Sequence, residues 1–160
     1  MKRVWAPWRM TYVSSEESQE CIFCVKPKGN ADRKNLILEH GKTAFIMMNA
    51  YPYNNGHMLI SPYRHIHKFE DLSEVEILEI MALMKKAIGI VRKLIHPHGF
   101  NIGLNQGKAA GSSFDHIHFH LLPRWNGDTN FMPTLADTKV IHEHISETYR
   151  RFYGEFQKST

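Results

Sequence analysis

The chain has 160 residues, of which 42% are hydrophobic and 22% are charged. This length and composition are typical of one globular domain and exclude a disordered or fibrous chain. No apolar run approaches the roughly 20 residues that a membrane-spanning helix needs. The 20 Lys and Arg residues exceed the 16 Asp and Glu residues, which gives a net charge of +4, and they do not cluster in one stripe. The unusual feature of the composition is its 11 histidines. The charge therefore suits small anionic ligands or weak nucleic-acid contact, and it does not establish a DNA-binding face.

Two further absences bear on where the protein works. The first residues, MKRVWAPW, contain no apolar signal segment. The two cysteines, Cys21 and Cys24, are too few for a disulfide framework. We therefore expect a cytoplasmic protein that does not enter a membrane.

Short apolar runs bounded by turn residues predict five strands. His40-Gly41 is typical of the turn of a first hairpin, and the sequence NAYPYNNG at 49–56 is typical of a loop. The predicted strands are residues 36–39, 43–48, 57–61, 100–105 and 116–122.

A helical period replaces the strand pattern after residue 71. Ser73 and Glu76 have the spacing of an N-terminal capping box, and Pro97 with Gly99 ends the helix. The apolar stripe expected to face the core comprises Ile77, Met81, Met84, Ile88, Val91 and Ile95. A last helix is predicted over 138–156, with Ile141, Ile145, Tyr149 and Phe152 on its apolar side.

The resulting element order is β-β-β-α-β-β-α. Strands joined by hairpins, with helices segregated between them, indicate an α+β fold. We expect a mainly antiparallel five-stranded sheet, one long central helix and a C-terminal helix.

The most informative segment is HIHFHLL at 116–122. Because strand side chains alternate between faces, His116, His118 and His120 are expected to share one face, with neighbouring rings roughly 6–7 Å apart. Three rings on one face would cost stability unless each finds hydrogen-bond partners, so the pattern favours chemistry over packing. A solvated strand face and a three-histidine metal site are the alternatives.

A small-residue loop, NQGKAAGSS at 105–113, precedes the histidines. Its glycines let backbone N–H groups approach a ligand closely, and Lys108 adds positive charge, as in a phosphate-binding loop. An ordinary long hairpin loop is the alternative.

The histidine pattern resembles the signature of the histidine-triad (HIT) family of nucleotide hydrolases and transferases. The segments FIMMN (45–49), GHMLISP (56–62) and LPRW (122–125) extend the resemblance to about residues 20–125. The segment 115–133 is similar to the bacterial diadenosine tetraphosphate phosphorylases and the fragile-histidine dinucleoside polyphosphate hydrolases. The resemblance implies one HIT domain over residues 1–160, with an N-terminal extension over 1–19 and a C-terminal loop and helix over 126–160.

The resemblance also implies roles for the candidate residues. His118 is the nucleophile that forms a nucleotidyl-histidine, while His116 and His120 complete the catalytic triad. His57 and His120 contact the phosphate oxygens. The remaining substrate contacts implied are Asn49 for the ribose, Phe45 and Met47 for the base, and Asn105, Gly111, Ser112 and Ser113 for the phosphates.

One residue departs from the family pattern. Ser112 stands where the family commonly has Gln, which is thought to help position the leaving group or the incoming water. The absence of this glutamine favours an acceptor other than water, such as inorganic phosphate.

The Cys21-x-x-Cys24 pair is typical of a metal site or a redox pair in a reducing compartment. Related HIT proteins and galactose-1-phosphate uridylyltransferases carry zinc on two cysteines and two histidines. The resemblance therefore implies a structural zinc on Cys21, Cys24, His65 and His116, with His67 as a substitute for His65. Buried free cysteines and a redox pair remain alternatives.

These patterns and the family resemblance together imply an enzyme that cleaves dinucleoside polyphosphates at the α-phosphate, with water or inorganic phosphate as the acceptor. A nucleotide-binding signalling protein with little turnover and a nucleoside phosphoramidate hydrolase are alternatives. A zinc-dependent nucleic-acid binder conflicts with the long Cys-to-His separation, so no nucleic-acid partner is expected. The family resemblance implies a homodimer, which would also cover an open sheet edge.

Overall fold

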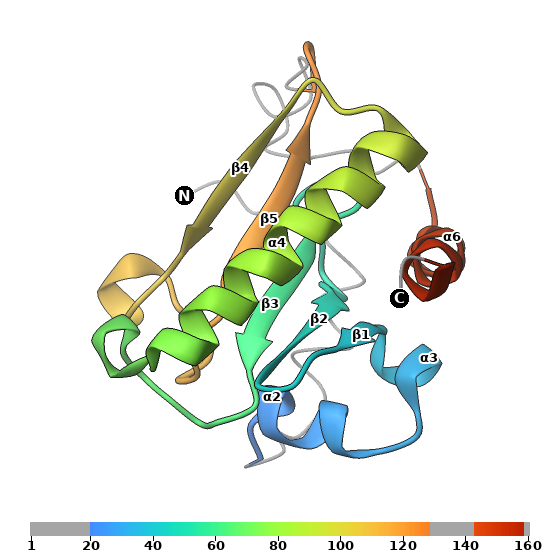
Figure 1. The fold of residues 1–160 in the computed structure, drawn as a ribbon. Helices are drawn as coiled ribbons and strands as arrows, with labels where there is room; N and C mark the ends of the chain where they lie inside the picture. The colour runs from blue at the N-terminus through green and yellow to red at the C-terminus, as the bar shows by residue number, and fades with distance from the viewer. Residues whose placement is uncertain (1–19, 129–142, 159–160) are drawn as a thin grey trace.

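The computed structural model describes residues 20–128 and 143–158. Five strands form one antiparallel sheet in the order β1-β2-β3-β5-β4, which confirms the predicted α+β class (Figure 1). The strands are β1 (Ile37–His40), β2 (Ala44–Met48), β3 (Met58–Pro62), β4 (Gly99–Leu104) and β5 (Phe119–Arg124). Four of them lie within a residue or two of the predicted ranges.

The first hairpin depends on a close approach at Gly41. A Cβ at this position would lie 2.7 Å from the carbonyl oxygen of Ala44 and from a carboxylate oxygen of Glu79. The same carboxylate accepts hydrogen bonds from the backbone N–H groups of Lys42 and Thr43. The turn is therefore fixed by a side chain from the long helix as well as by its own residues.

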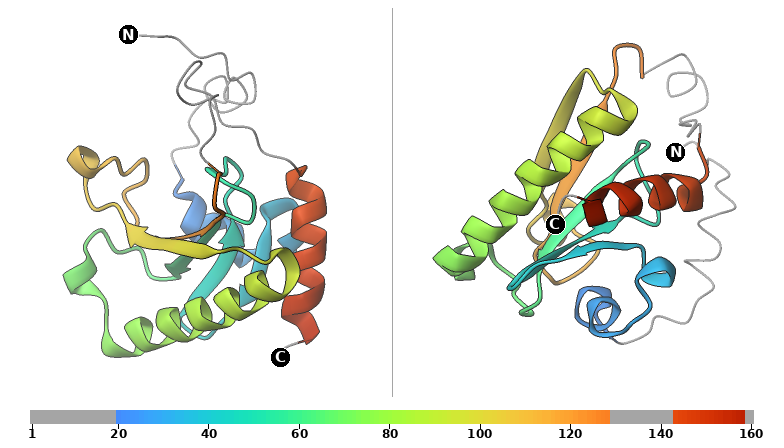
Figure 2. Two further views of the ribbon diagram at one scale, coloured as in Figure 1. Left: turned by 90° about the horizontal axis from the view of Figure 1, so that it is seen from above. Right: turned by 45° about the vertical axis from the view of Figure 1, so that its right-hand side comes forward.

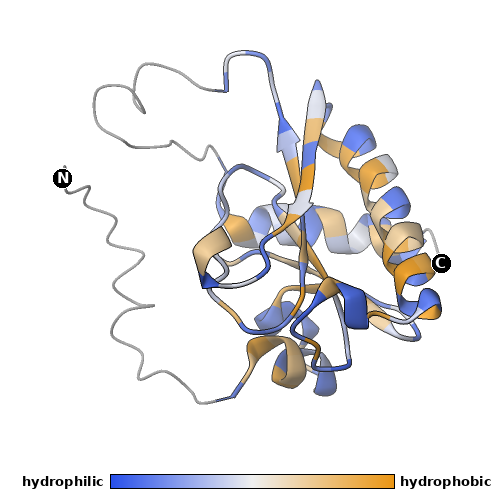
Figure 3. Ribbon diagram, turned by 90° about the vertical axis from the view of Figure 1, so that its left-hand side faces the viewer, coloured by the Kyte–Doolittle hydropathy of each residue, from blue (hydrophilic) through white to orange (hydrophobic). Residues whose placement is uncertain are grey.

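Two helices cover one face of the sheet. Helix α4 (Glu74–Ile95) runs across β2 and β3, and α6 (Ile145–Lys158) packs against β1 and α4 (Figures 1 and 2). Both apolar and polar residues occur along α4 (Figure 3), as a helix with one buried face requires, whereas every residue of β2 and β3 is buried. The main core lies in this layer and includes Ile117, Phe119 and Leu121, as predicted for the apolar face of the histidine segment.

The ends of α4 follow the sequence prediction. The Ser73 hydroxyl accepts from the Glu76 N–H while the Glu76 carboxylate accepts from the Ser73 N–H, so the capping box is present. His96 ends the helix in a left-handed conformation with φ of 46°.

The buried side of α4 differs from the predicted stripe. Met84 and Val91 are buried as expected, but Met81 is 44% exposed. The helix is rotated so that its buried residues are Glu76, Ile80, Leu83, Met84, Ala87, Ile90 and Val91. The prediction failed because α4 carries two apolar faces, and periodicity alone does not show which one meets the sheet.

Two predicted starting points were wrong. Strand β5 begins at Phe119 rather than residue 116, because Pro62 on the neighbouring strand has no N–H to extend the ladder beyond the Ile60–Phe119 pair. Helix α6 begins at Ile145, although 138 was the predicted start. Residues 138–142, including Ile141, lie outside the described part of the chain.

Short helices occupy segments that the sequence pattern left irregular. They are α2 (Ile22–Val25), η1 (Lys26–Lys28), α3 (Asp32–Asn35), η2 (Phe69–Asp71) and η3 (Lys108–Ala110). Within 20–128 and 143–158, no helix has the length and apolar character that a bilayer crossing requires.

Candidate active site and metal centre

The candidate site lies on the face of the sheet opposite α4. A second, smaller hydrophobic cluster covers part of this face, and its buried members are Phe23, Ile37, Phe45, Met47 and Leu59. Phe23 comes from α2, so the segment between the two cysteines packs directly on the sheet. This packing brings the cysteines next to the histidine segment.

Four predicted metal ligands converge at one end of this cluster. The ligand atoms of Cys21, Cys24, His65 and His116 all lie within 4.8 Å of one another. The Cys24 sulfur is 3.1 Å from His65 Nδ1, and the Cys21 sulfur is 3.3 Å from His116 Nδ1. Two sulfur and two nitrogen donors at these separations fit a tetrahedral ion such as Zn²⁺.

The ring of His116 is set in one tautomer. Its Nε2 lies 3.0 Å from the carbonyl oxygen of Pro62, which can only accept a hydrogen bond. Nε2 therefore carries the proton, and Nδ1 presents its lone pair to the two sulfur atoms. An outer hydrogen bond of this kind typically orients a metal-binding histidine. The structure thus places His116 in the candidate metal-binding cluster rather than in a row with the other two triad rings.

The ring of His118 is held in the opposite tautomer to that of His116. Its Nδ1 lies 2.8 Å from the carbonyl oxygen of His116, so Nδ1 carries the proton and Nε2 keeps its lone pair. Within the described residues, no hydrogen bond occupies that Nε2 atom. Burial lowers the pKa of His118, while the bond to the His116 carbonyl opposes the shift. The ring is therefore neutral near pH 7 and has a free nitrogen nucleophile.

A relay of hydrogen bonds sets the tautomer of His120. The Tyr53 N–H donates to His57 Nδ1 over 3.1 Å, so the proton of the His57 ring lies on Nε2. That Nε2 donates to His120 Nδ1 over 2.9 Å, which leaves the His120 proton on its own Nε2. His120 Nε2 is buried and has no hydrogen-bond partner among the described residues. An N–H group therefore remains available to a ligand oxygen, and its ring lies 5.0 Å from that of His118.

The pKa values support neutral rings in this relay. Burial, followed by the neighbouring His120 and His118, lowers the pKa of His57 to about 3. Burial and then His118 lower the pKa of His120 to about 4. Both rings stay neutral at pH 7, so the direction of each hydrogen bond is maintained.

A cavity of about 230 Å³ opens beside the relay. Asn105, His57 and His120 line it together with residues of β4, so the structure brings these three predicted site residues together. Asn49 also reaches the relay, because its side-chain amide lies 3.3 Å from His57 Nδ1. The side-chain oxygen of Asn49, Oδ1, accepts a hydrogen bond from the Tyr51 N–H.

The predicted phosphate loop lies at the edge of the site. Gly107 and Gly111 have φ angles of 81° and 84°, which a residue with a side chain rarely adopts. Gly111 and Ser113 are exposed, while the Ser112 hydroxyl donates to the carbonyl of Phe114. The Ser112 hydroxyl is thus engaged by a carbonyl of its own loop.

Phe45 and Met47 lie on the correct face but beneath other residues. They are 0% and 2% exposed, and Phe45 stacks on Tyr63. A base could touch either side chain only if the covering residues moved.

Sequence reasoning missed three aromatic neighbours of the histidines. Phe23 stacks on the His118 ring at 4.7 Å, Phe114 lies edge-on at 6.4 Å, and Tyr53 stacks on His120 at 6.2 Å. The position of Phe23 could have been predicted from the sequence, because a residue between Cys21 and Cys24 must lie near the triad if both cysteines share a metal site with His116.

The other histidines of the described segments make contacts away from the His118 and His120 rings. His67 pairs with Asp115 at 3.0 Å and is not a member of the ligand cluster. His40 pairs with Asp32, and His98 accepts from the Asn126 N–H. His118 and His120 do not join the cluster, so the alternative of a three-histidine metal site is not supported.

Comparison with known families agrees with this geometry. A family model described as "HIT domain" matches residues 30–127. This is more than half of the chain, and the protein belongs to the HIT family.

Two relatives and one structure make the comparison specific. The chain is 37% identical to the AP-4-A phosphorylase of Mycobacterium tuberculosis over 99% of this chain and 86% of that protein. It is 35% identical to the adenosine 5'-monophosphoramidase of Schizosaccharomyces pombe over 79% of this chain and 96% of that protein. The crystal structure of a Zn-bound histidine triad family protein from Mycobacterium smegmatis superimposes with a TM-score of 0.67, covering 88% and 95% of the two chains at 23% identity. That structural likeness shows the fold.

The buried relay predicts a pH dependence of stability. Between pH 6.5 and about 4, the unfolded chain binds protons at His57 and His120 that the folded chain does not. The free energy of unfolding should therefore fall as pH falls through this window, by up to about 1.4 kcal/mol per pH unit for each group. His57→Gln should make that decline shallower in urea titrations at matched metal content. Equal slopes for the variant and the wild type would contradict the role assigned to burial.

Proposed function

We propose that this protein cleaves dinucleoside polyphosphates at an α-phosphate through a nucleotidyl intermediate on His118. The observation that carries the proposal is that the adjacent rings of His118 and His120 are held in opposite tautomers. His118 Nε2 offers a lone pair, while His120 Nε2 offers a buried N–H with no partner among the described residues. An attacking nitrogen beside a hydrogen-bond donor suits nucleophilic displacement at phosphorus.

The reaction balances in two displacements. His118 Nε2 attacks the α-phosphorus of diadenosine tetraphosphate, the bond from that phosphorus to the bridging oxygen breaks, and ATP leaves. An oxygen of inorganic phosphate then attacks the adenylyl-histidine and releases ADP, which restores the free His118 ring. Water in place of phosphate would give AMP.

The remaining site residues have supporting roles in these two displacements. His120 Nε2–H donates to a phosphate oxygen, and His57 keeps that proton in place. Asn105 borders the same cavity, and a Cβ at Gly111 would lie 3.9 Å from the Asn105 amide nitrogen, so we expect the backbone near Gly111 and Ser113 to meet the further phosphates. Contacts from Asn49 to the ribose and from Phe45 and Met47 to the base stay predictions, and Phe23 is an additional candidate beside His118.

Phosphate is the acceptor we favour. Ser112 donates its hydroxyl within its own loop, so it does not replace the family glutamine as a group that positions water. The similarity to a mycobacterial AP-4-A phosphorylase over 99% of the chain supports the same choice. Nucleoside phosphoramidate hydrolysis is the second candidate, and the 35% identity to a monophosphoramidase favours it.

We predict that His118→Ala lowers cleavage of diadenosine tetraphosphate at least about 10³-fold, because the nucleophile is lost. The matched control is His98→Ala, since His98 is exposed and remote from the reacting rings. Products should be separated chromatographically with and without inorganic phosphate. ADP with ATP should form only when phosphate is present. Unchanged turnover in the His118 variant would refute the proposal, and AMP formation regardless of phosphate would refute phosphorolysis.

We further propose that the Cys21, Cys24, His65 and His116 cluster binds a structural zinc ion. The ion would fix α2 against the sheet and thereby hold Phe23 and the His116 backbone. No chemical step passes through it. A cytoplasmic location, which also stays a prediction, would keep both thiols reduced for this purpose.

Metal analysis tests the zinc proposal. The wild type should contain about one zinc per chain by native mass spectrometry, and removal by a chelator should lower its melting temperature. His65→Ala should lose the zinc, whereas His67→Ala should retain it because His67 lies outside the cluster. Loss from both variants, or from neither, would contradict this ligand set.

We also propose a homodimer through α4 and the free edge of β4. Val75, Leu78 and Met81 on α4 and Ile102 on β4 are 44–71% exposed apolar residues. Strand β4 has one neighbour in the sheet, so its outer edge could pair with a second copy.

Sedimentation velocity should show a dimer for the wild type. Leu78→Glu should shift it to a monomer, because a charge would enter the apolar contact. Lys34→Glu, at the opposite edge of the sheet, should remain dimeric. A monomeric wild type would contradict the assembly.

A further inference from the structure

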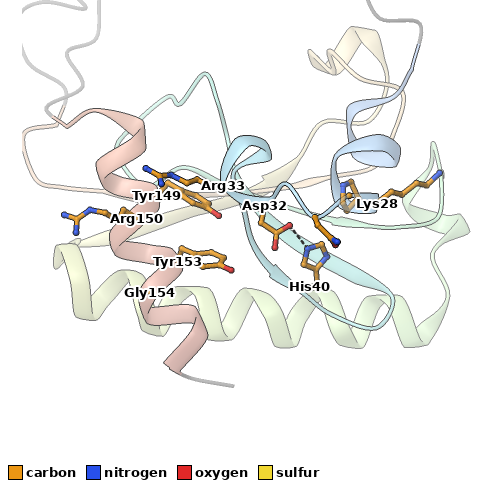
Figure 4. Close-up of a pocket in the computed structure, with 11 residues that line it drawn as sticks. Lys28, Asp32, Arg33, His40, Tyr149, Arg150, Tyr153 and Gly154 are labelled. Carbon is orange, nitrogen blue, oxygen red and sulfur yellow. Dashed lines mark hydrogen bonds and ion pairs between the residues drawn. The ribbon is translucent and has the colours of Figure 1, made fainter.

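A second, larger hollow lies at the β1 edge of the sheet. It has a volume of about 780 Å³ and is enclosed by α6, by the segment from Pro27 to Arg33, and by His40 (Figure 4). This volume is within the range of small-molecule sites. The hollow shares no lining residue with the cavity at His57 and His120. The mechanism proposed above therefore does not account for it.

The charge of its lining is mainly positive. Lys28 and Arg33 form no ion pair with any residue of 20–128 or 143–158, and Arg150 pairs with Glu147 at 3.0 Å. Asp32 is the acidic residue of the lining, and its carboxylate already pairs with His40 at 3.0 Å. An anionic ligand would complement this charge. Guanidinium groups such as Arg33 and Arg150 suit a phosphate in particular, because they can donate two parallel hydrogen bonds.

An aromatic surface completes the hollow. Tyr149 and Tyr153 project from α6 toward α3 and β1, with ring centres 5.5 Å apart and planes at 26° (Figure 4). Tyr149 is fixed, because it is buried and its hydroxyl donates to the Ile37 carbonyl. Tyr153 is half-buried, and its hydroxyl makes no hydrogen bond within the described segments. Such a ring can stack on a planar heterocycle.

We propose that this hollow is a second binding site for a nucleoside phosphate. Arg33 and Arg150 bind the phosphate groups, and the base stacks on Tyr153. The ligand must carry both parts, because the guanidinium groups and the tyrosine lie along the same hollow. The site is separate from the chemistry at His118 and does not depend on it.

Titration of the full-length, isotopically labelled protein with ADP tests this inference by NMR. ADP should shift the backbone amides of Gly29, Asp32 and Gly154 in a saturable manner. Adenosine and pyrophosphate should each bind there at least about tenfold more weakly than ADP. Equal binding of pyrophosphate, or shifts confined to the surroundings of His57 and His120, would overturn the proposal.

Variants separate this site from the proposed active site. Arg33→Glu and Tyr153→Leu, made singly, should weaken the shifts at the hollow at least about tenfold while diadenosine tetraphosphate cleavage continues. Lys34→Ala is the matched control, since Lys34 is exposed in α3 but does not line the hollow. Well-dispersed spectra will verify that each variant is folded. Unchanged ADP shifts at the hollow in both variants would overturn the proposal even if the proposed catalysis is intact.

Discussion

The hydrogen bond from His118 Nδ1 to the carbonyl oxygen of His116 is the interaction on which the candidate site depends. Over 2.8 Å it fixes both the orientation and the tautomer of the His118 ring. A ring protonated on Nε2 would have no lone pair facing a substrate. The parallel relay from Tyr53 through His57 gives His120 the opposite arrangement. Two like side chains thereby acquire different chemistry from their backbone surroundings.

His116 connects this interaction to the candidate metal-binding cluster. Its ring donates to Pro62 and faces the cysteines, while its carbonyl accepts from His118. A metal that fixes the ring would also fix the carbonyl. The same cluster holds α2, and α2 places Phe23 against His118. The candidate metal ligands, the packing of α2 and the position of the His118 ring are therefore parts of one arrangement.

Sequence patterns predicted the fold class and the capping box at Ser73, and the family resemblance implied the meeting of both cysteines with His65 and His116. They did not predict that β5 begins after His118, because this depends on Pro62 in a neighbouring strand. Nor could periodicity reveal which apolar face of α4 meets the sheet. The tautomers of His116 and His120 were also out of reach, since they depend on Pro62 and His57, which are distant in sequence. The hollow at Tyr153 combines segments more than 100 residues apart, and no local motif marks it.

The most direct measurement is the identification of the covalent intermediate. The wild type should be mixed with diadenosine tetraphosphate without phosphate, quenched at alkaline pH within milliseconds, digested and analysed by mass spectrometry. The predicted result is an adenylyl group on the peptide containing His118, localised to that residue. In a parallel sample that is not quenched, addition of phosphate should remove this group with formation of ADP. An adenylyl group on His120, or turnover without any adduct at His118, would contradict the account.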